Sequence, residues 1–185
     1  MSGRELLLSA AGLLVLAGCS LDYRGAGYSD KLSESTPDTV LYDFSTTTVH
    51  GSEPYFRIQA SVASTYDKKN LTVLSGVKFE QFDSKGKVIA SGTADSAVYH
   101  TDTENAELSG HIEMYSDTEK ARISAVSLSW NNSAKTLTGK TDSIVSIVKN
   151  TGSGISGTGF EAELKTRTVK FSGNVHGKWV EENSN

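Results

Sequence analysis

The residue types that could perform chemistry are few and scattered. The four histidines are His50, His100, His111 and His176, and no two of them recur at a spacing that would share a metal ion on a helix. His111 and Glu113 alternate within an extended pattern, which would place both on one face of a strand. Because a metal site there would need further ligands that the sequence does not show, we interpret them as exposed strand residues.

Two short motifs match catalytic or cofactor patterns only formally. Gly152–Gly157, "GSGISG", fits the dinucleotide fingerprint, but an alternating strand pattern follows it instead of a helix. We therefore expect a flexible loop there. Ser146–Lys149, "SIVK", fits S-x-x-K but lacks the K-T-G element of the penicillin-binding enzymes and reads as a strand. The sequence predicts no enzyme, no catalytic residue, no metal site and no cofactor.

Cys19 is the one residue whose position indicates a modification. It is the only cysteine, and it ends "LAGC" directly after the apolar stretch 6–17. That stretch is too short to span a bilayer and suits a signal peptide. The pattern matches a bacterial lipobox, in which the cysteine is lipidated and then anchors the protein to a membrane. We expect a signal peptide over 1–18 and a lipidated tether over 19–40, with a plain secretory signal as the alternative. Ser20, which follows the cysteine, does not decide which of the two bacterial membranes holds the anchor.

Composition excludes several classes of function. A chain of 185 residues with 37% hydrophobic residues suits one globular domain. The net charge is -4 and the lysines and arginines are interspersed with acids, so the sequence lacks the basic footprint of a nucleic-acid-binding protein. One cysteine allows no disulfide within the chain.

Strand patterns dominate from about residue 40 onward. The segment around "YFRIQASVAS" alternates, with Phe56, Ile58, Ala60 and Val62 on one face. Further strands are expected at 71–82, 88–100, 106–115, 121–130, 135–148, 159–166 and 168–180, with turn signals such as Asp83–Lys87 between them.

A glycine recurs at intervals of about thirty residues, in the second strand of each predicted hairpin. The glycines are Gly76, Gly110, Gly139 and Gly173, and each indicates a bend or bulge that curves the sheet. Such hairpins can bury their apolar faces as two facing sheets or as one sheet folded over itself. Alanine-rich inner faces leave room between the layers, although a simply packed β-sandwich core is an equally natural outcome.

Three segments together resemble the LptC family, which comprises periplasmic, membrane-anchored components of the lipopolysaccharide export bridge. They are Val49–Asp67, Ala94–Ser116 and Ser156–Trp179. The motif glycines that carry the resemblance are Gly51, Gly76, Gly110, Gly157, Gly159 and Gly173. The resemblance covers about 41–180, which we expect to be the folded domain, followed by a polar tail at 181–185.

The resemblance implies an all-β fold, a twisted open β-jellyroll of two facing antiparallel sheets built from repeated hairpins. It implies no catalysis, and lipid acyl chains held between the sheets. The partners would be lipopolysaccharide or another glycolipid, the jellyroll of an ABC transporter permease at the N-terminal edge, and an LptA-like bridge protein at the C-terminal edge. The family's location is periplasmic at the inner membrane, with the outer membrane not excluded by the sequence.

The strand alternation supplies the expected lipid-facing residues. They are Phe56, Ile58, Ala60, Val62, Val77, Phe79, Leu108, Ile112, Met114, Phe160, Ala162, Leu164, Val169 and Phe171. Arg57, Lys78 and Arg167 are candidates for contact with headgroup phosphates. A different class of function, an envelope lipoprotein that serves as an adhesin or scaffold without cargo, predicts the same pattern with a dry, packed interior.

Overall fold

The computed structural model describes residues 35–180, and the β-structure lies in the unit that begins at Thr36. Apart from the 3-10 turn at Asp67–Lys69 and Ser35, the regular structure of these residues is β. The strands are β1 (Thr39–His50), β2 (Glu53–Tyr66), β3 (Leu71–Phe82), β4 (Val88–His100), β5 (Asn105–Ser116), β6 (Ala121–Asn131), β7 (Thr136–Gly139), β8 (Val145–Lys149), β9 (Gly154–Thr158), β10 (Glu161–Glu163), β11 (Thr168–Lys170) and β12 (Gly173–Lys178).

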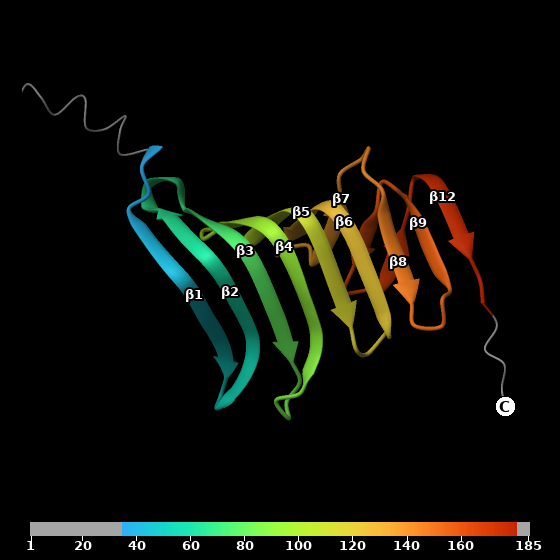
Figure 1. Ribbon diagram of the computed structural model, residues 1–185, viewed down its shortest axis with the longest axis horizontal. Coiled ribbons are helices and arrows are strands. Elements are labelled where there is room, and N and C mark those ends of the chain that lie inside the picture. Colours follow the sequence, from blue (N-terminus) through green and yellow to red (C-terminus); the bar gives the residue numbers. More distant parts are fainter. Residues whose placement is uncertain (1–34, 181–185) are drawn as a thin grey trace, which may run out of the picture. The chain divides into compact units, whose positions relative to one another are not determined.

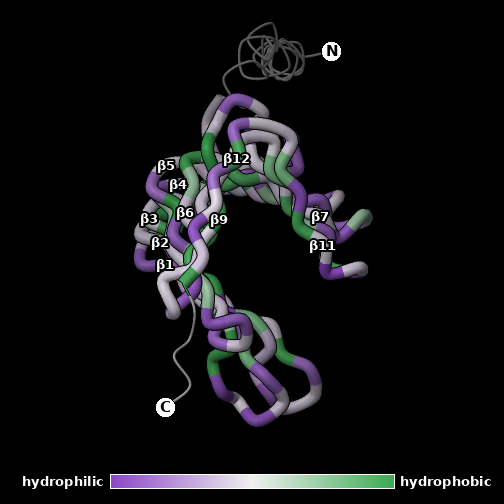
Figure 2. Tube along the Cα trace, turned by 90° about the vertical axis from the view of Figure 1, so that its right-hand side faces the viewer, coloured by the Kyte–Doolittle hydropathy of each residue, from purple (hydrophilic) through white to green (hydrophobic). Residues whose placement is uncertain are grey.

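All twelve strands belong to one antiparallel sheet that forks at β6 (Figure 1). From β1 to β6 each strand pairs with the next one in the chain. The second half of β6 then pairs with β7, which continues to β10 and β11. The first half of β6 pairs with β8, which continues to β9 and β12. In Figure 2 the arm that holds β7 and β11 diverges from the one that holds β9 and β12.

The fork arises because each long strand is bent near its middle along a shared line, which we call the crease. In a flat strand, residues of one face are two apart, but the buried pairs here are three apart. They are Ala60 with Ala63 on β2, Leu74 with Val77 on β3, and Ala94 with Ala97 on β4. Each of these three strands therefore changes the phase of its alternation at the crease, so that both of its halves turn an apolar face inward. On β5 the inward residues Leu108 and Ile112 are four apart, and an extra residue takes up the bend instead.

The halves on either side of the crease form two layers of the same sheet. Layer A contains the halves next to the turns at 67–70, 101–104 and 132–135, and it continues into β7, β10 and β11. Layer B contains the halves next to the turns at 51–52, 83–87 and 117–120, and it continues into β8, β9 and β12. One hydrophobic cluster joins residues from both layers along the crease, from Ala60 to Phe160.

Glycines with a left-handed backbone make the crease possible on β3 and β5. Gly76 has φ +62° and Gly110 has φ +93°, values that a side chain disfavours. A Cβ at Gly76 would lie 2.5 Å from the Ser61 hydroxyl oxygen, and one at Gly110 would overlap the Asp95 side chain. The bend that the recurring glycines predict is thus confirmed at these two strands.

The all-β fold with two facing layers is confirmed, although the layers are halves of a single sheet. Three local predictions are wrong. The expected strand at 135–148 is two strands, β7 and β8, and the expected loop at 152–157 contains most of β9. The expected terminal strand at 168–180 is divided into β11 and β12, which lie in different layers. All three errors fall where the chain crosses the crease or pairs beyond the fork.

Candidate functional site

The inner surface of the bent sheet is the largest apolar feature that the strands assemble. Side chains from neighbouring strands line up across it in rows, because antiparallel register places them opposite one another. Two rows flank the crease. The crease row of layer A is Leu41, Ala63, Leu74, Ala97, Leu108, Leu128 and Gly139. The crease row of layer B contains Phe44, Ala60, Val77, Ala94, Ile112, Ala125 and Val145.

Small and large residues alternate along the crease, which lets the two layers meet there. β2 and β4 contribute alanines, whereas β3 contributes Leu74 and Val77 and β5 contributes Ile112. Leu128 and Val145 are completely buried at the fork. This part of the inner surface is therefore a packed core, without room for a ligand.

Farther from the crease, layer B carries a second apolar row that is only partly covered, which we call the far row of layer B. It contains Ile58, Phe79, Gly92, Met114, Ile123, Ile147 and Ile155 in direct cross-strand register. The Phe79 ring occupies the space that a side chain at Gly92 would need. The large side chains of this row are half-buried or exposed, so the row is accessible apolar surface.

Layer A also has a second row on its inner face farther from the crease, the far row of layer A, and this row changes from polar to apolar along its length. It runs Thr39, Thr65, Thr72, Tyr99, Ala106, Trp130, Leu137, Ala162 and Val169. The threonines of β2 and β3 are 3.1 Å apart through their hydroxyl oxygens, Thr65 to Thr72. From Trp130 onward the row is apolar, so the inner surface of layer A is polar near β1 and apolar near β11.

The inner surface is open at both edges of the sheet. Leu41 on β1 is 46% exposed, and Val169 on β11 is 50% exposed. Ile155 on β9 and Val175 on β12 are exposed as well. A sealed sandwich would cover such side chains, so the two layers enclose an apolar surface that remains reachable from solvent.

The expected lipid-facing residues fall into three groups. Those in the hydrophobic cluster or packed on it are Ile58, Ala60, Val77, Leu108, Ile112, Met114, Phe160, Ala162 and Phe171. Phe56, Phe79 and Val169 lie on the inner face farther from the crease, and Leu164 directly follows β10 and is exposed. Phe160 is fully buried against Phe171, with ring centroids 5.5 Å apart.

Val62 lies on the other face. It pairs with Tyr42 and Ser75, next to a row of serines, while Ala63 is the buried neighbour. The uninterrupted alternation predicted from Phe56 to Val62 is wrong beyond Ala60, because the phase changes at the crease. For the same reason the sequence analysis missed Leu74, Ala97 and Leu128. The glycines at 76 and 110 carry the only sequence signal for this change.

The other motif glycines mark the crease and a turn. Gly159 lies at the crease between β9 and β10, and Gly51 lies in the turn between β1 and β2. A Cβ at Gly157 would lie 3.0 Å from the Gly173 carbonyl oxygen, so β9 and β12 approach closely there.

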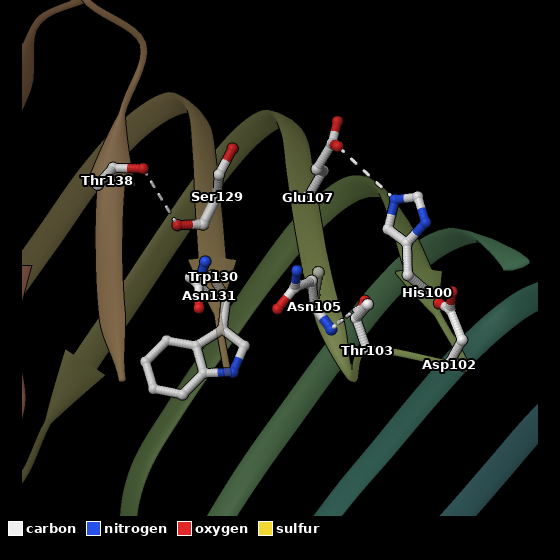
Figure 3. A pocket seen from close by; sticks show the side chains of 10 residues that line it. His100, Asp102, Thr103, Asn105, Glu107, Ser129, Trp130, Asn131 and Thr138 are labelled. Carbon is white, nitrogen blue, oxygen red and sulfur yellow. Dashed lines mark hydrogen bonds and ion pairs between the residues drawn. The ribbon is translucent and has the colours of Figure 1, made fainter. Parts of the chain in front are cut away.

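The outward surface is polar and holds two shallow hollows. One, of about 430 Å³, lies over β4 to β7 beside the turn at 101–104, and its lining includes His100, Glu107 and Ser129 of the outward face as well as Trp130 (Figure 3). His100 Nε2 lies 3.7 Å from a Glu107 carboxylate oxygen. The other, of about 290 Å³, lies over Gly92 between Lys78 and Glu113. Arg57 and Lys78 are on this outward face, and Arg57 pairs with Glu80 at 3.1 Å.

The sequence motifs do not assemble into a reactive centre. Ser146 lies within β8, and the Asp95 carboxylate accepts a hydrogen bond from the His111 backbone N–H at 3.1 Å. This bond and the His111 ring lower the pKa of Asp95. In residues 35–180 no group of three or more histidine, cysteine or acidic side chains could hold a metal. Cys19 and the tail at 181–185 lie outside the described residues.

The edges of the sheet are unpaired within the part of the chain that the structure describes. β1 pairs only with β2, while β11 and β12 pair only with β10 and β9. β1 is twelve residues long and contains no lysine, arginine or proline. Those are the residues that usually protect an edge from pairing with another chain.

Comparison with known families matches residues 6–180 to the family described as lipopolysaccharide-assembly, LptC-related. The match covers nearly the whole chain. The chain belongs to the LptC family. The resemblance seen in the sequence is thus confirmed, and no curated protein matches in addition.

Membership in the LptC family implies a component of the lipopolysaccharide transport bridge, associated with the cell envelope on its periplasmic side. LptC proteins are transport components, not known as catalysts. Within residues 35–180 there is no helix with the length and apolarity needed to span a membrane.

Proposed function

We propose that this LptC-family protein binds the acyl chains of lipopolysaccharide or a related glycolipid against the partly covered inner rows of its two layers. The observation that supports the proposal is the far row of layer B, a continuous apolar strip from β2 to β9 with half-buried or exposed side chains. Each methylene group that leaves water contributes about 0.8 kcal/mol, so such a strip holds chains without polar precision. The crease rows are its floor.

The two edges serve in the transfer of lipid. β1 receives the jellyroll of an ABC transporter permease by strand addition, and β11 with β12 receives an LptA-like bridge protein. The long edge of β1, whose one acidic residue is Asp43 and which has no lysine, differs from the short, lysine-bearing strands β11 and β12, and this supports different partners at the two ends.

The anchor is the lipidated Cys19, with 1–18 removed as a signal peptide and 19–40 acting as a tether. The proposal rests on the sequence pattern "LAGC". Mass measurement of the protein extracted from membranes tests it, since cleavage before Cys19 shortens the chain and lipidation of Cys19 adds acyl mass.

The lipid-binding proposal is tested by native mass spectrometry of the full-length protein extracted from its own envelope. We expect a bound glycolipid that identifies the cargo. In Ile155→Glu, which places a charge in the far row of layer B, we expect the lipid to be lost while the circular dichroism spectrum is unchanged.

Val148→Glu is the matched control. Ile155 is 39% exposed on the inner face, and Val148 is 44% exposed on the outward face of the neighbouring strand β8. Because both side chains are partly exposed, neither change removes much packing. The two variants therefore differ only in the face of the sheet that carries the new charge. A wild-type protein that carries no lipid and takes up none when it is added would support the scaffold function instead.

A further inference from the structure

The turn between β10 and β11 combines apolar side chains with unpaired positive charges. The apolar half of the far row of layer A ends there, running from Trp130 through Leu137 and Ala162 to Val169. Leu164, the first residue of the turn, is 56% exposed. The turn therefore lies at the end of the apolar part of layer A, beside the unpaired edge that β11 forms.

Two cations in this turn have no partner. Lys165 and Arg167 are exposed, and their side chains make no hydrogen bond or ion pair with any residue in 35–180. The backbone of Lys135 is adjacent, because the Leu164 N–H donates to its carbonyl oxygen at 3.0 Å, but the Lys135 ammonium is held by Asn132.

The acids nearest in sequence only partly offset these cations: Glu161 pairs with another lysine, and Glu163 keeps its charge, which leaves Glu163, Lys165 and Arg167 with a sum of +1. The Glu161 carboxylate lies 3.7 Å from the Lys170 ammonium, and the Glu163 carboxylate accepts a hydrogen bond from the Thr166 hydroxyl at 2.9 Å. In a chain whose net charge is -4, a turn with two free cations is a local excess of positive charge.

The backbone at Arg167 sets this turn apart from its neighbours. Charged residues with positive φ also occur in three other hairpin turns, at Glu104, Lys120 and Lys135. In each of those the side chain bonds a partner, respectively Asn132, Asp117 and Asn132. Arg167 has φ +54° and no such bond. A bulky residue in this disfavoured region, without a compensating contact, points to a role outside the fold.

We propose that the β10–β11 turn binds the phosphate headgroup of the lipid whose acyl chain lies along the apolar row ending at Val169. The inference rests on the proposed function and adds the headgroup position to it. The planar guanidinium of Arg167 presents paired donors that match phosphate oxygens, while Lys165 adds a point charge. The headgroup thus lies at the rim of layer A next to the C-terminal edge.

Fluorescence of Trp130 reports on the acyl part of this site, because Trp130 begins the apolar row that ends three strands away at Val169. The chain has two tryptophans, and Trp179→Phe leaves Trp130 as the only one. The full-length protein in this background is titrated with dodecyl phosphate, with dodecyl maltoside, which has the same chain and a neutral headgroup, and with inorganic phosphate alone. The same titrations are made with Lys165→Gln/Arg167→Asn, in which asparagine tolerates the positive φ.

We expect dodecyl phosphate to bind about tenfold more tightly than dodecyl maltoside, and inorganic phosphate alone to bind weakly. The double variant should lose this preference but keep its affinity for dodecyl maltoside. The control Lys85→Gln/Lys140→Gln removes two exposed charges from other turns and should keep the preference.

The outcomes separate the two proposals. If both amphiphiles bind equally to the wild-type protein, or if the control loses the preference as much as the double variant does, the headgroup site is wrong while acyl binding stands. If neither amphiphile binds, both proposals are wrong. Tight binding of inorganic phosphate alone would overturn a lipid headgroup as the ligand.

Discussion

The first six strands and the last six solve the same bending problem differently. β1–β6 run through the crease without a break. The inward alternation of β2, β3 and β4 changes phase there, and β5 has an extra residue at the bend. Beyond β6 the chain is cut at the crease instead, into β7 and β8, β9 and β10, and β11 and β12. Left-handed glycines serve both regions, Gly76 and Gly110 in the continuous one and Gly159 in the divided one, but only in the divided one do two large rings, Phe160 and Phe171, fill the crease.

The difference shows what a bent sheet requires. A strand keeps its hydrogen bonds through a sharp bend only if its residues there tolerate an unusual backbone and close neighbours. Where the chain breaks, the two layers are free to diverge, and large side chains occupy the gap. The divided region also carries exposed apolar side chains, Val169 on the inner face and Leu164 in the turn before it.

The largest expected effect comes from reversing the phase in the continuous region. Ala63→Asp places a carboxylate in the buried cluster and should lower the free energy of unfolding by at least ~3 kcal/mol. Val62→Asp, one residue earlier on the outward face, should cost less than ~1 kcal/mol. Urea denaturation of the two variants measures both. Equal losses would mean that β2 does not change phase at the crease.

A smaller effect separates the two regions through their glycines. Gly110→Ala adds a Cβ at φ +93° against Asp95, and we expect a loss of about 3 kcal/mol from backbone strain and overlap together. Gly139→Ala in the divided region has an ordinary backbone but would lie 2.8 Å from a Val145 methyl group. Its loss should be about 1–2 kcal/mol, from overpacking alone. The order of the two urea midpoints decides the comparison, and a larger loss at Gly139 would reverse it.

The smallest effect concerns an ion-pair cluster in the turns of the continuous region. Asp117 contacts Lys120 and lies 2.7 Å from the Lys87 ammonium, and these hydrogen bonds lower the pKa of Asp117 from 3.8 to about 2. A lowered pKa contributes stability above about pH 4, which is lost as the pH falls from about 4 to about 2. Asp117→Asn should therefore lower the urea midpoint slightly at pH 7 and leave it unchanged near pH 2.

Asp83 and Asp95 also have lowered pKa values, so the wild-type protein loses stability in acid for several reasons. Only the difference between the wild-type protein and Asp117→Asn isolates the cluster. A difference that persists unchanged at pH 2 would show that the asparagine acts through packing.

The sequence was sufficient to predict the fold class, because alternation and turn residues report directly on strands. It also indicated the bend, through Gly76 and Gly110. The phase of the alternation was not predictable at the crease. In Ala60–Ser61–Val62–Ala63 both phases place apolar residues inward, and the larger Val62 favoured the wrong one. Likewise, nothing local in 135–148 distinguishes a continuous strand from two, since the break depends on pairing with β6 and β10.

The placement of the left-handed residues has a consequence for how such a protein can change its length in evolution. Within β1–β6 they lie on alternate strands, at Asp43 on β1, Gly76 on β3 and Gly110 on β5. The smallest insertion that preserves the spacing is therefore a whole hairpin, one strand with such a residue and one without. Duplication of a hairpin would lengthen both layers by the same amount. Gain or loss of a single strand would instead place side by side two strands that both have, or both lack, a left-handed residue at the crease. We thus expect related chains to differ in length by complete hairpins.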